Sequence, residues 1–163
     1  MGAHAAPRLE DFSYRGPYEY SLTICTYSPQ QCFLDATTVE RVRTHLLRIS
    51  SEETFDVTAY CFMPDHVHVL VTGTSEESDL RRYVSRWKQA TGYQYKGMTG
   101  GRLWQPGFYD HILRQEEDRR TVIRYLLNNP IRAGLVASLN DYPYWGSGLW
   151  TREQLIEEIL NTS

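Results

Sequence analysis

Two histidines separated by one valine are the residues whose types and spacing most clearly predict chemistry. His66 and His68 lie in CFMPDHVHVLVTG, residues 61–73, whose apolar and β-branched composition is typical of a strand. Strand side chains alternate between two faces, so both imidazoles are predicted on one face and Val67 on the other. Two imidazoles on one face form half of a metal site. The same pattern also arises by chance, so the rest of the chain must supply a third group.

A second candidate group precedes an Asn-Pro pair. Thr121, Tyr125 and Asn129 are spaced by four residues and share one face of the helix predicted over 116–129. A tyrosine hydroxyl, with an ordinary pKa of about 10, can attack a phosphodiester when a divalent cation withdraws charge from the phosphate. The Asn129 carbonyl is a candidate third ligand, and two imidazoles with an amide oxygen suit Mg²⁺ or Mn²⁺. The alternatives are a packing role for Tyr125 and a helix-end role for Asn129.

An α+β domain is predicted to position these groups. Composition and alternation predict strands over 18–27, 55–62, 66–72 and 108–113. Helical periodicity and capping residues predict helices over 37–49, 78–95, 116–129 and 151–160. The short connection over 63–65 makes the second and third strands an antiparallel hairpin. This order predicts a ferredoxin-like antiparallel sheet with helices packed on one face.

Length and composition favour one intracellular domain. The 163 residues are 41% hydrophobic and suit a single core. We expect residues 1–17 to be a flexible lead, residues 18–147 the domain and residues 148–163 a C-terminal helical tail. The sequence has no apolar run of the roughly 20 residues that span a membrane, and the three cysteines contain no Cys-x-x-Cys pair. A reducing cytoplasm is the expected location.

Charge is distributed unevenly along the chain. The formal net charge is −3, but the stretch 81–132 holds 11 Lys or Arg and 4 Asp or Glu, which gives +7. The remainder holds 6 basic and 16 acidic residues, which gives −10. One surface can therefore be basic on an acidic protein, although a solvated helix face would give the same pattern.

Four ordered segments resemble the single-tyrosine HUH transposases, specifically the insertion-sequence-200 type and its REP-associated relatives. The resemblance covers about residues 18–147. It rests on the segments FMPDHVHVL (62–70), LWQPGFYDHILR (103–114), YLLNNPIRAGLV (125–136) and DYPYWGS (141–147).

The resemblance implies a ferredoxin-like fold and metal-dependent cleavage of single-stranded DNA, commonly near a hairpin. His66 and His68 would bind Mg²⁺ or Mn²⁺, with Asn129 as the candidate third ligand. Tyr125 would attack the DNA phosphate and form a 5′-phosphotyrosine bond. His111 occupies the family's strand-histidine position, with a role near the metal or as a hydrogen-bonding core residue.

The expected partner is single-stranded or hairpin DNA, bound by a monomer or homodimer that is nucleoid-associated when DNA-bound and does not engage a membrane. Trp87, Phe108 and Tyr109 could stack on bases, and Trp104, beside glycine and proline, is best placed to be exposed. The basic residues expected to contact phosphates are Arg81, Arg82, Arg86, Lys88, Arg114, Arg119, Arg120, Arg124 and Arg132.

Two other functions fit parts of the sequence. One is a domesticated DNA-binding protein of the same fold with little or no cleavage activity. The presence of all three residues His66, His68 and Tyr125 argues against this alternative. The other is a phosphodiesterase that uses water, but such two-histidine enzymes need paired His-x-Ser/Thr motifs, which the sequence lacks.

Overall fold

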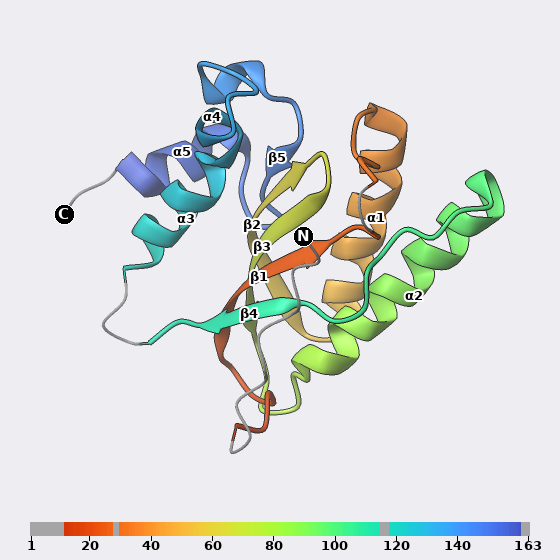
Figure 1. The fold of residues 1–163 in the computed structure, drawn as a ribbon. Coiled ribbons are helices and arrows are strands. Elements are labelled where there is room, and N and C mark those ends of the chain that lie inside the picture. Colours follow the sequence, from red (N-terminus) through yellow and green to blue (C-terminus); the bar gives the residue numbers. More distant parts are fainter. Residues whose placement is uncertain (1–11, 28–29, 115–117, 161–163) are drawn as a thin grey trace.

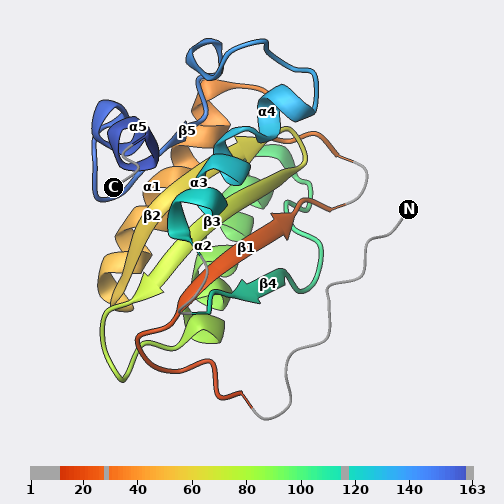
Figure 2. The ribbon, with the colours of Figure 1, turned by 90° about the vertical axis from the view of Figure 1, so that its left-hand side faces the viewer.

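A five-stranded antiparallel sheet lies between two layers of helices (Figures 1 and 2). The computed structural model describes residues 12–27, 30–114 and 118–160. The strands are β1 (Glu19–Cys25), β2 (Phe55–Met63), β3 (His66–Gly73), β4 (Tyr109–Ile112) and β5 (Trp145–Gly146), in the order β4-β1-β3-β2-β5. The helices are α1 (Ala36–Glu52), α2 (Leu80–Thr99), α3 (Arg119–Leu127), α4 (Asn129–Arg132) and α5 (Arg152–Leu160), with a 3₁₀ turn η1 (Leu139–Asp141).

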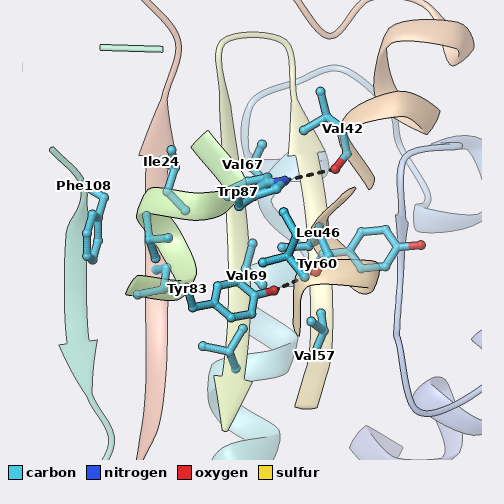
Figure 3. Close-up of a cluster of buried hydrophobic side chains, with 14 of the residues drawn as sticks. Ile24, Val42, Leu46, Val57, Tyr60, Val67, Val69, Tyr83, Trp87 and Phe108 are labelled. Atoms are coloured by element: carbon cyan, nitrogen blue, oxygen red, sulfur yellow. Dashed lines mark hydrogen bonds between the residues drawn. The ribbon is translucent and has the colours of Figure 1, made fainter. Parts of the chain in front are cut away.

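The two long helices, α1 and α2, cover one face of the sheet. Each begins at an aspartate whose side chain caps the first turn: Asp35 accepts from the Thr38 amide, and Asp79 accepts from the Arg82 amide. Two buried aromatic side chains of α2 tie it to α1 (Figure 3). The Tyr83 hydroxyl donates to the Leu46 carbonyl at 2.9 Å, and the Trp87 indole N–H donates to the Val42 carbonyl at 3.0 Å.

The shorter helices α3, α4 and α5 cover the opposite face of the sheet (Figure 1). Ile123 and Leu126 of α3 pack with Leu155 of α5 against side chains of β2 and β3. Almost every residue of β2 is buried, because helices cover both faces of the central strands.

An extra residue in β2 changes which of its side chains face each core. The pairing register with β3 shifts between Val57 and Ala59, so Thr58 forms a bulge. Before the bulge, Phe55 and Val57 face the α1–α2 core. Beyond it, Tyr60 and Phe62 face that core, whereas the alternate residues Ala59, Cys61 and Met63 face the second core.

The predicted α+β class is confirmed, and the order β1α1β2β3α2β4 with its sheet order is ferredoxin-like. The expectation that all helices pack on one face needs correction, because it holds only for α1 and α2. A flexible lead is also wrong for residues 12–17, since Tyr14 is 1% exposed and stacks with Tyr20. The rest of the predicted lead, residues 1–11, and the start of the predicted helix at 116 lie outside the described residues.

Candidate active site

Strand β3 presents His66 and His68 on one face, as the alternation predicts. Val67 and Val69 are buried in the α1–α2 core, so the two imidazoles lie on the α3–α4 side of the sheet. Their Nε2 atoms are 3.1 Å apart. Because β3 pairs with both β1 and β2, the histidines lie on the central strand, at its start beside the β2–β3 turn.

Each imidazole is oriented by a hydrogen bond at its other nitrogen. His66 Nδ1 lies 2.7 Å from the Asp65 carboxylate, and His68 Nδ1 lies 3.1 Å from the Thr23 hydroxyl. A carboxylate accepts the His66 Nδ1–H, which leaves the lone pair of His66 Nε2 directed at His68. Oriented neutral imidazoles are the form that binds metal ions.

Electrostatics keep His68 neutral near physiological pH. The pKa of His68 is lowered to about 3. Burial is the main cause, and the positive charges of His66 and Arg132 contribute the rest. A neutral imidazole can act as a ligand once one ring nitrogen offers its lone pair, without first losing the proton of the charged form.

Asn129 reaches the histidines from the first position of α4, directly after α3. Helix α3 ends at Leu127, Asn128 caps it, and α4 begins at Asn129 with Pro130 in its first turn. Proline fits this position because its missing N–H has no partner in the first turn of a helix. The Asn129 amide nitrogen lies 3.3 Å from His66 Nε2.

These three side chains suit a cation. Two nitrogen ligands about 2.1 Å from one metal ion and at right angles lie roughly 3 Å apart, close to the observed 3.1 Å. The described part of the chain contains no group of three or more His, Cys, Asp and Glu residues that could hold a metal ion. Asn129 could supply an amide oxygen as a third ligand if its side-chain amide were flipped by 180°.

Tyr125 lies one helical turn before Asn129, on the exposed side of α3. Its side chain is 65% exposed, whereas Ile123, Leu126 and Leu127 form the buried side of the helix. The Arg132 guanidinium lies over the Tyr125 ring, 3.8 Å from the ring centroid. This exposure contradicts the alternative in which Tyr125 is a packing residue.

The basic residues predicted to contact DNA do not form one surface. Arg81, Arg82, Arg86 and Lys88 belong to α2, on the layer opposite the histidines. Arg82 and Arg86 form ion pairs with Glu53 at 3.2 and 2.8 Å. Arg81 and Lys88 line a groove of about 770 Å³ beside α2.

The remaining predicted basic residues come from β4 to α4, on the side of the histidines. Arg119 is paired with Glu19 at 2.7 Å, and Arg124 donates to the Ile159 carbonyl. Arg114 is exposed just after β4, Arg120 lies in the first turn of α3, and Arg132 ends α4. A single basic surface was wrong because residues adjacent in sequence lie on two layers of the fold.

The aromatic residues predicted to stack on bases are mostly core residues. Trp104 is 5% exposed, and its indole N–H donates to the Thr91 hydroxyl at 2.8 Å, so the expected exposure is wrong. Trp87 and Phe108 are also buried, and Tyr109 is half-buried. The indole of Trp104 packs between Phe33 and Trp87 and completes the α1–α2 core.

His111 lies on the edge strand β4, with an exposed side chain. It pairs with Ser21 of β1, which in turn pairs with Leu70 of β3. This register places His111 on the same face as the histidine pair but separated from β3 by one whole strand. The exposure of His111 does not fit a buried core residue.

Two site residues were not predicted as such. Asp65 adjoins the histidines in sequence, and a carboxylate beside a candidate ligand was a usable signal. Thr23 is far away in sequence and reaches His68 only through the pairing of β1 with β3. No local pattern identifies it.

The fold and the paired histidines define a protein of the single-tyrosine HUH transposase class. Residues 17–129 match the family described as Transposase IS200 like, and the chain belongs to that family.

Two curated relatives are similar in sequence to this chain. The REP-associated tyrosine transposase of Escherichia coli (strain K12) is 25% identical over 108 residues, which cover 66% of this chain and 64% of the relative. A relative from Haemophilus influenzae is 26% identical over 102 residues, 55% of this chain and 57% of that protein. The chain thus spans less than two thirds of the length of these relatives.

A solved structure of a REP-associated tyrosine transposase bound to a REP hairpin has the same fold. The TM-score is 0.71 at 21% identity, over 86% of this chain and 82% of that one. A protein from Deinococcus radiodurans R1 gives a TM-score of 0.51 at 23% identity, over 76% and 97% of the two chains. No helix within the described residues is both long and apolar enough to cross a membrane.

Proposed function

We propose that this protein nicks single-stranded DNA and transfers the cut strand through a covalent 5′-phosphotyrosine at Tyr125. The observation that supports this most directly is the meeting of His66, His68 and Asn129 at one point, one helical turn from an exposed tyrosine. A nucleophile and a candidate phosphate-activating centre on one side of the sheet are the two parts that this reaction needs.

In the proposed reaction, the Tyr125 hydroxyl oxygen forms a bond to phosphorus while the bond from phosphorus to the 3′-oxygen breaks. The phenolic proton is lost to solvent, and the leaving 3′-oxygen takes up a proton. Attack by a 3′-hydroxyl on the phosphotyrosine then reverses these changes and joins a strand. The phosphodiester is conserved, so no nucleotide cofactor is required.

His66, His68 and Asn129 would hold the Mg²⁺ or Mn²⁺ ion. When bound, the ion would withdraw charge from the scissile phosphate. Asp65 and Thr23 would keep the two imidazoles turned toward that point, since each occupies the nitrogen that does not face the site.

The proposed substrate is hairpin-forming single-stranded DNA. The solved structure with the same fold is bound to a REP hairpin, and the chain belongs to a transposase family. Arg114 and Arg120, in the segment between β4 and the first turn of α3, are the proposed phosphate contacts.

The first experiment tests for the covalent intermediate. The protein is incubated with Mn²⁺ and labelled hairpin DNA from the regions that flank its gene, and a denaturation-resistant adduct is expected. Tyr125→Phe should abolish the adduct because the attacking oxygen is gone. Tyr93→Phe, which changes another exposed tyrosine on the opposite layer, is the matched control and should retain it.

The histidine variants separate cleavage from binding. His66→Ala and His68→Ala should abolish the adduct and leave salt-sensitive DNA binding largely intact, since phosphate contacts supply most of the affinity. An adduct that survives Tyr125→Phe would exclude this nucleophile. Hairpin binding by the wild-type protein with no adduct on any flanking sequence would instead indicate a domesticated DNA-binding protein.

A further inference from the structure

Arg132 makes the shortest arginine–aromatic contact within the described residues, and its partner is the candidate nucleophile. The guanidinium carbon lies 3.8 Å from the centroid of the Tyr125 ring. The corresponding distances elsewhere are 4.6 Å for Arg152 over Trp145 and 4.9 Å for Arg102 over Tyr27.

Helix α4, directly after α3, carries Arg132 to the Tyr125 ring. Arg132 follows Tyr125 by seven positions, about two helical turns, and Asn128 between the two helices has right-handed helical φ and ψ (−80°, −3°), so both side chains lie on the same side of the helical path. Several backbone features secure α4: Pro130 is buried, its carbonyl accepts from the Leu135 amide, and Gly134 ends the turn with a φ of +74°. Arg132 is therefore carried by a well-defined turn.

A stacked cation suits the needs of an exposed nucleophile. The Tyr125 side chain is 65% exposed, so few contacts from the α3 side restrict its ring. A guanidinium over the ring face holds the ring and leaves the hydroxyl, at the ring edge, uncovered. A nucleophile that is oriented before reaction has less freedom to lose on the way to the transition state.

Arg132 also links the nucleophile to the histidine site. Asn129 and Arg132 are the first and last residues of α4, and Asn129 contacts His66. The same short helix thus brings one side chain to the candidate metal ligands and another to Tyr125. We propose that Arg132 is a positioning residue, which holds the Tyr125 ring in place for attack beside the histidine pair. This inference rests on the proposed function.

The competing interpretation is that Arg132 is simply a phosphate contact, and affinity and rate separate the two. A phosphate contact sets the Kd and contributes about one unit to the slope of log K against log salt. A positioning residue sets the rate of adduct formation at saturating DNA. Arg132→Ala should therefore slow adduct formation at saturation about two- to fivefold, the factor carried by an exposed cation–π contact. The Kd and its salt slope should be little changed.

Two further variants sharpen this measurement. Arg102→Ala removes an arginine stacked on another exposed tyrosine, Tyr27, and should leave the rate at saturation unchanged. Arg132→Lys keeps the charge and therefore any phosphate contact, but it lacks the planar group that stacks on the ring. We expect Arg132→Lys to bind DNA like the wild type and to react more slowly.

A second readout does not depend on activity. With 3-fluorotyrosine placed at position 125, the ¹⁹F signal of the DNA-free protein should shift and sharpen in Arg132→Ala, because the ring gains freedom, and should not change in Arg102→Ala. An unchanged ¹⁹F signal in Arg132→Ala would overturn the inference, as would a wild-type rate at saturation. A raised Kd with a lower salt slope and a normal rate would identify a phosphate contact instead. If the wild-type protein forms no adduct, the proposed function fails, and the ¹⁹F signal still decides whether Arg132 holds the ring.

Discussion

At the scale of single residues, the orientation of His68 depends on one hydroxyl from a neighbouring strand. The Thr23 hydroxyl lies 3.1 Å from His68 Nδ1. Thr23→Val keeps the shape of the side chain and removes this partner. We expect the affinity for Mn²⁺ to fall about 10- to 100-fold, the usual cost of losing such an outer partner. Titration of free Mn²⁺ by electron paramagnetic resonance measures the affinity.

Thr23→Ser is the matched control for this prediction. It retains the hydroxyl and should keep an affinity close to that of the wild type. Equal affinities for the valine and serine variants would mean that the hydroxyl does not orient His68.

The residue pattern predicted the candidate site well where its members are local. The alternation of β3 placed His66 and His68 on one face, and the spacing of four placed Tyr125 and Asn129 in successive turns. Thr23 could not be predicted, because its place opposite His68 depends on the register of two strands that are distant in sequence. Trp104 was misjudged because flanking glycine and proline indicate an irregular segment and say nothing about its burial.

At the scale of elements, the capping carboxylate of α1 makes a testable contribution to stability. The Asp35 side chain accepts a 2.8 Å hydrogen bond from the Thr38 amide, and this bond is the main cause that lowers the pKa of the carboxyl. Asp35→Ala should reduce the free energy of unfolding by about 0.5–2 kcal/mol at pH 7. Urea denaturation measures the difference.

The pH dependence follows from the lowered pKa of Asp35. Its carboxylate stabilises the fold above the ordinary value of 3.8, and this contribution is lost as the pH falls below 3.8 through the folded-state pKa. The stability difference between wild type and Asp35→Ala should therefore shrink in acid. Asp35→Asn keeps a capping oxygen without titrating there, so its difference from Asp35→Ala should stay constant. A wild-type difference that is also constant down to pH 2 would contradict the prediction.

Most element boundaries were predictable, and the break at the site was not. Capping and periodicity placed the two long helices to within a few residues. The predicted helix over 116–129 ends at Leu127, and Asn129 begins α4. Pro130 disfavours continuation of the predicted helix. Proline also fits the first turn of a new helix, which is where Pro130 lies, buried, in α4.

At the scale of the whole molecule, the C-terminal helix is part of the second core. Leu155 is 0% exposed among side chains of that core, whereas Leu160 is 67% exposed on the same helix. Leu155→Ala should reduce the free energy of unfolding by about 2–5 kcal/mol, because it leaves a cavity. Thermal and chemical denaturation measure the loss.

Leu160→Ala removes the same atoms from the surface and should change the stability by less than about 0.5 kcal/mol. Equal effects of the two substitutions would mean that α5 is not held against the sheet. A large loss confined to Leu155→Ala would show that the expected tail is a structural component of the layer that carries Tyr125.

The distribution of charge also belongs to the scale of the whole molecule. The count of basic residues over 81–132 was correct. This stretch, however, includes α2 on one face of the sheet, the strand β4, and α3 and α4 on the other face. Several of its arginines are matched by Glu19, Glu52 and Glu53 from other segments. A sum along the sequence cannot reveal either effect, because both depend on how distant elements pack.

The bulge at Thr58 decides which layer of the molecule receives the histidines. It reverses the phase of the in–out alternation halfway along β2, and the tight hairpin passes the new phase on to β3. A β2 of the same length without the bulge, still anchored by Phe55 and Val57, would turn His66 and His68 into the α1–α2 core and away from Tyr125. The side of the sheet on which the HVH sequence lies is thus set by the bulge that accommodates the extra residue of the preceding strand.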